Sequence, residues 1–314
     1  MAFRSAGPSW CHTCAVDDAR PKPSGISLWV TGARPRTLPA AVVPVLVGTA
    51  TAAAESSPHW WRALPAAVVS LALQVGVNYA NDYSDGIKGT DDSRVGPLRL
   101  VGSDLVPAGR VKRAAFAAFG VAGIFGLWLA VVSSLWLLLV GATAILAAWF
   151  YTGGPRPYGY AGLGEVFVFV YFGLVATVGT GYAVGGTLTP MMWLAGSAAG
   201  CFSCALLVIN NLRDIPGDTV SGKRTLAVRI GDGRTRVLFV SMFVAAGACV
   251  VAAAVTDGAP VLIGLVGVLA SLGPVRAVRS GASGRDLIPV LGAVGRAQLV
   301  FGAAFSAGIL IALS

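Results

Sequence analysis

The sequence predicts an all-α membrane protein with about nine transmembrane helices. Hydrophobic residues make up 55% of the 314 residues, and charged residues only 12%. A soluble domain contains about 25% charged residues, so the composition favours a membrane protein. A helix that crosses a bilayer needs roughly 20 mainly apolar residues. The chain has nine such segments, at residues 37–54, 60–80, 114–132, 135–151, 165–184, 191–210, 236–256, 259–275 and 292–313.

The basic residues predict how these helices are oriented. With a cytoplasmic N-terminus and alternating helices, 22 of the 23 Lys and Arg residues fall on the cytoplasmic side, and only Arg62 falls outside. This asymmetry is the positive-inside pattern of multi-pass proteins of the cell membrane. Because orientation next to lipid headgroups accounts for the net charge of +9, we expect a lipid bilayer and no nucleic acid as the partner.

Residues 1–28 are polar and are expected to form a disordered tail that precedes a transmembrane domain at 29–314. They contain no apolar segment of the kind found in a cleaved signal peptide. Cys11 and Cys14 flank a histidine in this tail. A C-x-x-C pair can bind a metal, but the second pair of a structural zinc site is missing, so the motif alone does not predict a metal site.

Two long cytoplasmic loops predict where the chemistry takes place. The outer loops are short, whereas the loops after the second and sixth predicted helices cover about 83–113 and 211–235. Both are rich in Gly and in charges of both signs, and long loops in a compact protein are usually functional or disordered. We therefore expect the site at the cytoplasmic face.

The same acidic pattern begins both loops. The two motifs are Asn78-x-x-x-Asp82-x-x-Asp85 and Asn210-x-x-x-Asp214-x-x-x-Asp218. They end helices that are four helices apart and have the same orientation, which predicts two related halves. This parallel repeat differs from the inverted repeat that many carriers use.

Helix geometry predicts which of these side chains share a face. Residues four apart in a helix point the same way, so each Asn lies with the first Asp of its motif. Asp85 stays on that face if its helix continues. Pro216 disfavours helical conformation at the residue before it, so Asp218 is expected on a turn just past the helix end.

Carboxylates clustered in this way predict a Mg²⁺–diphosphate site. Mg²⁺ prefers oxygen ligands and is typically held by a few carboxylates together with substrate phosphates. Two facing clusters suit two or so Mg²⁺ ions bridged by a diphosphate. Basic residues in the same loops suit the remaining phosphate oxygens: Lys88, Arg94, Lys223, Arg224 and Arg229. The chain has no nucleotide-binding glycine motif.

A diphosphate site at a membrane surface predicts a substrate with a charged head and a lipid-soluble tail, such as a prenyl diphosphate. Departure of the diphosphate leaves an allylic cation, which aromatic rings can stabilise. Tyr151, Tyr158 and Tyr160 lie at the matching end of the fourth predicted helix. For a single tyrosine, an interfacial aromatic belt is the simpler explanation. Glu165 follows them and could act on a substrate proton.

Five stretches resemble a known family. N-D-Y-S-D-G-I-K-G-T-D at 81–91 and N-N-L-R-D-I-P-G-D-T-V-S-G-K-R-T-L-A-V-R-I-G at 210–231 are similar to the two signatures of the UbiA-type intramembrane prenyltransferase superfamily. The stretches at 33–48, 95–103 and 154–165 resemble its branch that acts on 1,4-dihydroxy-2-naphthoate. The resemblance covers the chain from about residue 29 to its C-terminus.

The resemblance implies nine helices around a central cavity that opens to the cytoplasm and to lipid. It also implies Mg²⁺-dependent transfer of a polyprenyl chain from its diphosphate to the naphthoate, an aromatic acid, with loss of the carboxyl group. The product is demethylmenaquinone, an intermediate of menaquinone biosynthesis. The six motif residues would bind metal and diphosphate, and Lys88, Lys223 and Arg224 would contact the diphosphate. The wider first motif is N-D-x-x-D-x-x-x-D, and here Gly89 replaces its last Asp, so Asp91 is the candidate for that role.

The acceptor's carboxylate needs a partner outside the two acidic loops. Arg34 precedes the first predicted helix and can bind a carboxylate through two hydrogen bonds, although a plain positive-inside anchor explains it equally well. Within the same chemistry, 4-hydroxybenzoate or homogentisate are alternative acceptors. An ion-coupled lipid or metabolite carrier is the alternative of a different class. The parallel repeat and the lack of charge at the membrane midplane argue against a carrier.

Overall fold

The computed structural model describes residues 24–89 and 98–313, and within these ranges the chain is helical and has no strand. The all-α prediction is therefore confirmed. The predictions for most of the tail, including Cys11 and Cys14, and for Asp91 and Arg94 fall outside the described residues.

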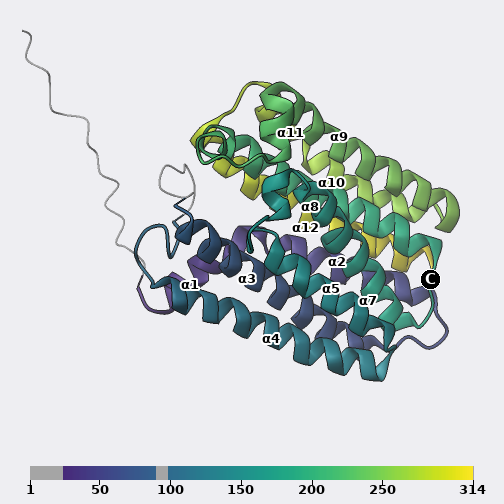
Figure 1. Cartoon of the computed structure of the whole chain (residues 1–314). Helices are drawn as coiled ribbons and strands as arrows, with labels where there is room; N and C mark the ends of the chain where they lie inside the picture. The colour runs from purple at the N-terminus through teal and green to yellow at the C-terminus, as the bar shows by residue number, and fades with distance from the viewer. Residues whose placement is uncertain (1–23, 90–97, 314) are drawn as a thin grey trace, which may run out of the picture.

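The helices follow one another along the chain in the order shown in Figure 1. They are α1 (Ile26–Ala33), α2 (Pro39–Thr51), α3 (Ala63–Ile87), α4 (Ala108–Val132), α5 (Trp136–Phe150), α6 (Gly164–Val168), the π-helix η5 (Phe169–Val175), α7 (Ala176–Gly185), α8 (Pro190–Val220), α9 (Leu226–Asp257), α10 (Leu265–Ala270), α11 (Leu272–Arg279) and α12 (Leu287–Ala312). Short 3₁₀ turns lie between them at Pro35–Thr37, Ala52–Ala54, Trp60–Arg62, Tyr158–Ala161, Ala259–Gly264 and Gly284–Asp286.

The predicted count of nine membrane spans is not confirmed. In the described part of the chain, 7 helices are long and apolar enough to cross a bilayer. The bent pair Ile26–Thr37 and Pro39–Ala54, with an angle of 56° between its parts, brings the number to at most 8. Trp136–Phe150 is apolar but has only 15 residues. At 1.5 Å per residue it is about 22 Å long, which is short of the roughly 30 Å hydrocarbon core.

α8 corrects one expectation about the second motif. The helix continues through Pro216 to Val220, so Asp218 lies on the helix and not on a turn after it. The proline removes one backbone hydrogen bond. Packing compensates for that loss, because Leu212 is buried and Ile215 packs against the main hydrophobic core. The local preference of the residue before proline is overridden by these tertiary contacts.

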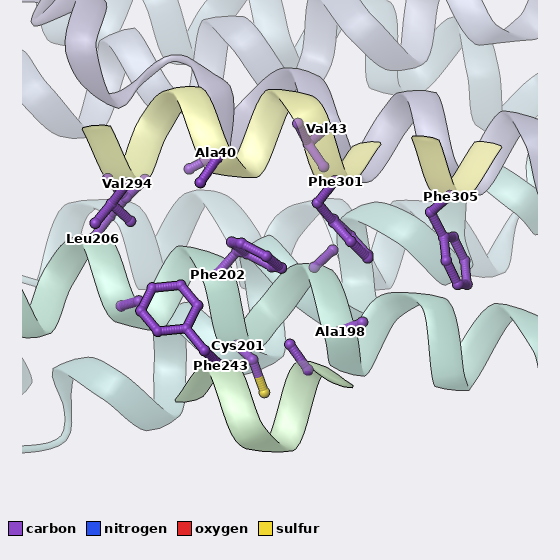
Figure 2. Packing of buried hydrophobic residues seen from close by; sticks show 14 of the residues in the cluster. Ala40, Val43, Ala198, Cys201, Phe202, Leu206, Phe243, Val294, Phe301 and Phe305 are labelled. Carbon is purple, nitrogen blue, oxygen red and sulfur yellow. The ribbon is translucent and has the colours of Figure 1, made fainter. Parts of the chain in front are cut away.

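The main core lies among α2, α8, α9 and α12. Figure 2 shows Phe202 and Phe243 between the helices that face them. The rings of Phe202 and Phe301 stack with centroids 4.8 Å apart, and Phe243 meets Phe202 edge-on at 5.5 Å. In Figure 1 the other side of the molecule includes α1, α3, α4 and α5. α2 joins the two sides, because it packs against α3 and α7 as well as against α8 and α12.

α8 also approaches the π-helix very closely. A Cβ atom added at Gly173 would lie 2.6 Å from the Cα of Gly200, so only glycine allows this crossing. α8 is therefore packed against the π-helix η5 on one side and against the main core on the other. Its last turns, which carry the second acidic motif, are positioned by both.

Candidate active site

A cavity of about 780 Å³ runs between the two sides of the molecule. Its wall includes residues of α2, α3, α4, α5, α7 and α8. On α3 alone, both Ala66 and Asp85 line it, and a helix rises about 28 Å over these 19 residues. The end near Asp85 is polar, whereas the wall elsewhere carries apolar side chains such as Leu73, Leu137 and Val140. The cavity therefore suits a long molecule with one charged end.

Asp85 joins the two predicted loops. Its Oδ1 lies 3.0 Å from the Lys223 Nζ and accepts a 2.5 Å hydrogen bond from the Tyr160 hydroxyl. The Arg99 Nη2 lies 3.4 Å from its Oδ2. Lys223 follows α8, whereas Asp85 is near the end of α3, so this ion pair brings the first and second motifs to one site. The carboxylate itself is buried.

The second motif places two carboxylates on the same cavity. Asp214 and Asp218 both line it, as does Asn210. The guanidinium of Arg213 binds the Asp214 carboxylate in a bidentate way, at 2.7 and 2.8 Å. The Asp218 Oδ2 lies 3.5 Å from the Thr225 hydroxyl. The polar end therefore combines carboxylates with cations already close to them.

Asp82 differs from the other predicted ligands. It does not line the cavity. Its carboxylate oxygens accept hydrogen bonds from the backbone N–H groups of Leu100 and Val101, at 2.8 and 3.0 Å. Asp82 thus holds the loop at Leu100 and Val101 against α3. Its position in the structure is that of a structural anchor for this loop.

Asn81, which was not among the predicted ligands, lines the cavity instead. Its Oδ1 accepts a 2.7 Å hydrogen bond from Thr152. Asn81 precedes Asp85 by four residues, as Asn210 precedes Asp214. The family motif N-D-x-x-D, which begins at this residue, was the signal that could have identified it. Asn78 also lines the cavity, but its amide donates to the backbone of Ala33 and to Thr37.

The predicted diphosphate contacts are only partly brought together. Lys223 lines the cavity, whereas Arg224 and Arg229 are exposed and do not. Lys88 is exposed and donates to the carbonyl of Thr152 at 2.8 Å. Arg99 was not predicted, yet it is buried and lines the cavity next to Asp85.

The three tyrosines have different positions. The ring of Tyr160 lies 4.8 Å from the Nζ of Lys88 and 4.8 Å from the Nζ of Lys223, so it belongs to the charged end. Tyr158 lines the cavity with its ring stacked on Phe167 at 3.9 Å. Tyr151 meets Tyr158 edge-on at 5.5 Å. Burial raises the pKa of the Tyr158 phenol above its ordinary value.

Glu165 and Arg34 complete the predicted set. Glu165 is not part of the cavity wall. Its Oε1 accepts a 2.9 Å hydrogen bond from Asn211, and Asn211 does line the cavity. Arg34 lines the cavity and adopts a left-handed backbone conformation, with φ 54° and ψ 70°. Its Nη2 is buried and has no hydrogen-bond partner among the described residues. This guanidinium is therefore available to an anion in the cavity.

The donor set at the polar end suits Mg²⁺. Within residues 24–89 and 98–313, no group of three His, Cys, Asp or Glu side chains is arranged to hold a metal ion by itself. Mg²⁺ usually takes one or two carboxylates, several waters and phosphate oxygens of the substrate. The carboxylates of Asp85, Asp214 and Asp218 with nearby Asn amides provide such hard oxygen ligands.

Comparison with known proteins identifies the family. Residues 41–286 match the UbiA prenyltransferase family. The chain belongs to this family. This UbiA protein is 50% identical to the 1,4-dihydroxy-2-naphthoate octaprenyltransferase of Mycobacterium leprae, over 90% of this chain and 96% of that protein. It is 49% identical to the protein with the same description from Mycobacterium tuberculosis, with the same coverage.

Solved UbiA structures share the fold. A UbiA homolog from Aeropyrum pernix matches with a TM-score of 0.68 at 16% identity, over 86% of this chain and 97% of that one. A UbiA homolog from Archaeoglobus fulgidus, solved with GPP and Mg²⁺, matches with a TM-score of 0.66 at 14% identity, over 90% of this chain and 100% of that one. The sequence-based predictions of a UbiA fold, a prenyltransferase and a multi-pass membrane protein are confirmed.

Proposed function

We propose that this UbiA enzyme transfers a polyprenyl chain from its diphosphate to 1,4-dihydroxy-2-naphthoate, giving demethylmenaquinone. The bond between the prenyl carbon and the diphosphate oxygen breaks, a bond from that carbon to the ring forms, and the acceptor's carboxyl group leaves as CO₂. The observation that carries this proposal is the 50% identity, over nearly the whole of both chains, to a relative described as acting on this naphthoate. The long cavity with one charged end supports it.

The polar end would hold Mg²⁺ through Asp85, Asp214 and Asp218, with Asn81 and Asn210 as further oxygen donors. When bound, Mg²⁺ neutralises charge on the departing diphosphate. Lys223 and Arg99, which lie beside Asp85, would bind diphosphate oxygens directly. Arg213, already paired with Asp214, fixes the direction of that carboxylate.

The apolar part of the cavity would hold the prenyl chain. Its wall between α3 and α5 carries aliphatic side chains, and Tyr158 with Phe167 adds a stacked aromatic surface nearer the charged end. Rings at that position can stabilise positive charge on the allylic carbon. The Nη2 of Arg34, which has no partner in the described part of the chain, is suited to the carboxylate of the aromatic acid. The two substrates would then meet between the diphosphate end and Arg34.

A direct assay tests the proposal. Purified protein in detergent is incubated with farnesyl diphosphate, Mg²⁺ and each of three acids: the naphthoate, 4-hydroxybenzoate and homogentisate. We expect a decarboxylated, prenylated product from the naphthoate, identified by mass, and no product after chelation of Mg²⁺. If 4-hydroxybenzoate or homogentisate gave product and the naphthoate gave none, that acid would replace the naphthoate as the assigned acceptor. An absence of turnover, combined with ion-driven transport in sealed vesicles, would support the carrier alternative.

We further propose that the N-terminus and the charged end of the cavity face the cytoplasm, because the basic residues gather on that side. In a cysteine-free background, Ser57→Cys should react with a membrane-impermeant maleimide in intact cells. Val220→Cys, which is 82% exposed at the other end of the bundle, should react only after the membrane is opened. The reverse labelling pattern would contradict this orientation.

A further inference from the structure

A small polar network joins α3 to the turn around Arg34. The Nδ2 of Asn78 donates to the carbonyl of Ala33 at 2.8 Å and to the Thr37 hydroxyl at 3.2 Å. Gln74, one turn earlier on α3, donates to the same hydroxyl at 2.9 Å. The Thr37 hydroxyl in turn donates to the carbonyl of Arg34 at 2.9 Å. Asn78 thus holds the carbonyl of Ala33 directly, and Asn78 and Gln74 together hold the Thr37 hydroxyl that bonds the carbonyl of Arg34.

The chemistry of the partners fixes the direction of the Asn78 amide. A backbone carbonyl can only accept a hydrogen bond, so the group of Asn78 that faces Ala33 must be its NH₂. The Thr37 hydroxyl has one proton, which it gives to the Arg34 carbonyl, and two lone pairs, which suit the donors from Asn78 and Gln74. In this network Asn78 therefore acts as a donor to backbone and hydroxyl oxygens.

The turn needs such support. A non-glycine residue in the left-handed region is strained, and Arg34 also precedes a proline, which favours an extended backbone at this position. Backbone strain of this kind persists where the surroundings enforce it, often at functional sites. Here the enforced conformation accompanies a guanidinium that lines the cavity and whose buried Nη2 has no hydrogen-bond partner within residues 24–89 and 98–313.

We propose that Asn78, together with Gln74 and Thr37, is a positioning residue that holds Arg34 toward the aromatic acid, and that Asn78 is not a metal ligand. The inference rests on the proposed function, in which Arg34 binds the acceptor's carboxylate. It divides the asparagines of α3 by role: Asn81 belongs to the diphosphate end and Asn78 to the acceptor end.

Asn78→Asp separates the two roles. A metal ligand would keep its oxygen and gain a charge, so Mg²⁺ would bind as well as before or better. A positioning residue would instead lose the N–H groups that donate to Ala33 and Thr37. The new carboxylate would also repel the carboxylate of the acceptor. We expect KM for the naphthoate to rise about tenfold, the change that the loss of one or two hydrogen bonds produces. KM for the prenyl diphosphate and the half-saturating Mg²⁺ concentration should stay at their wild-type values.

A binding measurement makes the test independent of turnover. The naphthoate alone, added to detergent-solubilised protein without prenyl diphosphate, should raise the unfolding temperature of the wild type and much less that of Asn78→Asp or Asn78→Ala. Arg34→Lys should show the same loss, and the Arg34→Lys, Asn78→Ala double variant should be no worse than Arg34→Lys alone. Such non-additivity is expected when one residue acts through the other.

Tyr79→Phe is the matched control. Tyr79 follows Asn78 on α3 and also ties this helix to a backbone carbonyl, that of Trp29, at 2.9 Å, but it does not line the cavity. Removal of its hydroxyl should lower the unfolding temperature and leave KM for the naphthoate unchanged. Asn81→Ala serves as the second comparison, because it should raise the Mg²⁺ requirement instead.

Two results would overturn the inference: a raised Mg²⁺ requirement in Asn78→Ala that Asn78→Asp restores, or wild-type naphthoate binding in both variants. The proposed function fails differently, because then the wild type itself would neither bind nor prenylate the naphthoate. The two failures are therefore distinguishable in one set of measurements.

Discussion

Replacing Asp85 with Asn should lower turnover per folded molecule about a thousandfold, the size of effect seen when a group that stabilises developing charge is removed. Asp85 is the carboxylate on which Lys223, Arg99 and Tyr160 converge, and it links the two motif helices. Asn keeps the size and one acceptor oxygen but removes the charge that Mg²⁺ requires. Turnover is measured at saturating prenyl diphosphate and acceptor, over a range of Mg²⁺ concentrations.

The unfolding temperature is measured in parallel, because the two buried cations next to Asp85 lose a counter-charge and stability will fall somewhat. Asp257→Asn is the matched control, since this carboxylate lies at the far end of α9, away from the cavity. It should retain wild-type turnover. An Asp85→Asn enzyme that reaches near-wild-type turnover at high Mg²⁺ would remove Asp85 from the catalytic residues.

Asp82→Ala should behave in a different way and mainly destabilise the protein, by about 3 kcal/mol. The buried carboxylate accepts two backbone hydrogen bonds, and its removal leaves the N–H of Leu100 buried without that partner. We expect a clear fall in unfolding temperature, measured by fluorescence in detergent, while the folded fraction keeps most of its turnover at low temperature. The Mg²⁺ requirement should not change.

Asp82→Asn sharpens the comparison, because one side-chain oxygen can still accept from the loop and part of the stability should return. A stable Asp82→Ala protein that no longer responds to Mg²⁺ would show the opposite, namely that Asp82 is a metal ligand. The Asp82 carboxylate would then have to reach the cavity in the working enzyme.

The sequence was enough to predict the helical fold, because apolar segments of membrane length have few alternatives to a helix. It misplaced the end of α8, since the effect of Pro216 depends on whether Leu212 and Ile215 are packed. Spacing could not choose between Asn78–Asp82 and Asn81–Asp85, because both pairs are four residues apart on one helix. Only the packing around α3 shows that the second pair lines the cavity through both members.

Loop charges were the hardest part to assign. Lys223, Arg224 and Arg229 lie close together in the sequence, yet only Lys223 lines the cavity. The direction of each side chain is set by the backbone of the turn after α8, where the N–H of Arg224 donates to the carbonyl of Tyr160. The sequence did not predict Arg99 either, because its position depends on how the loop held by Asp82 folds back onto α3.

The uneven distribution of charge along the cavity has a consequence for what happens after the reaction. The enzyme would bind each proposed substrate through the substrate's own negative group. Lys223 and Arg99 would bind the diphosphate, and Arg34 would bind the carboxylate. The prenylated ring has lost both groups, so none of these cations retains an ionic hold on it. The aliphatic wall then offers it little more than the surrounding lipid does. The chemistry itself would thus release the product into the bilayer, and a product that accumulates there should inhibit the enzyme only weakly.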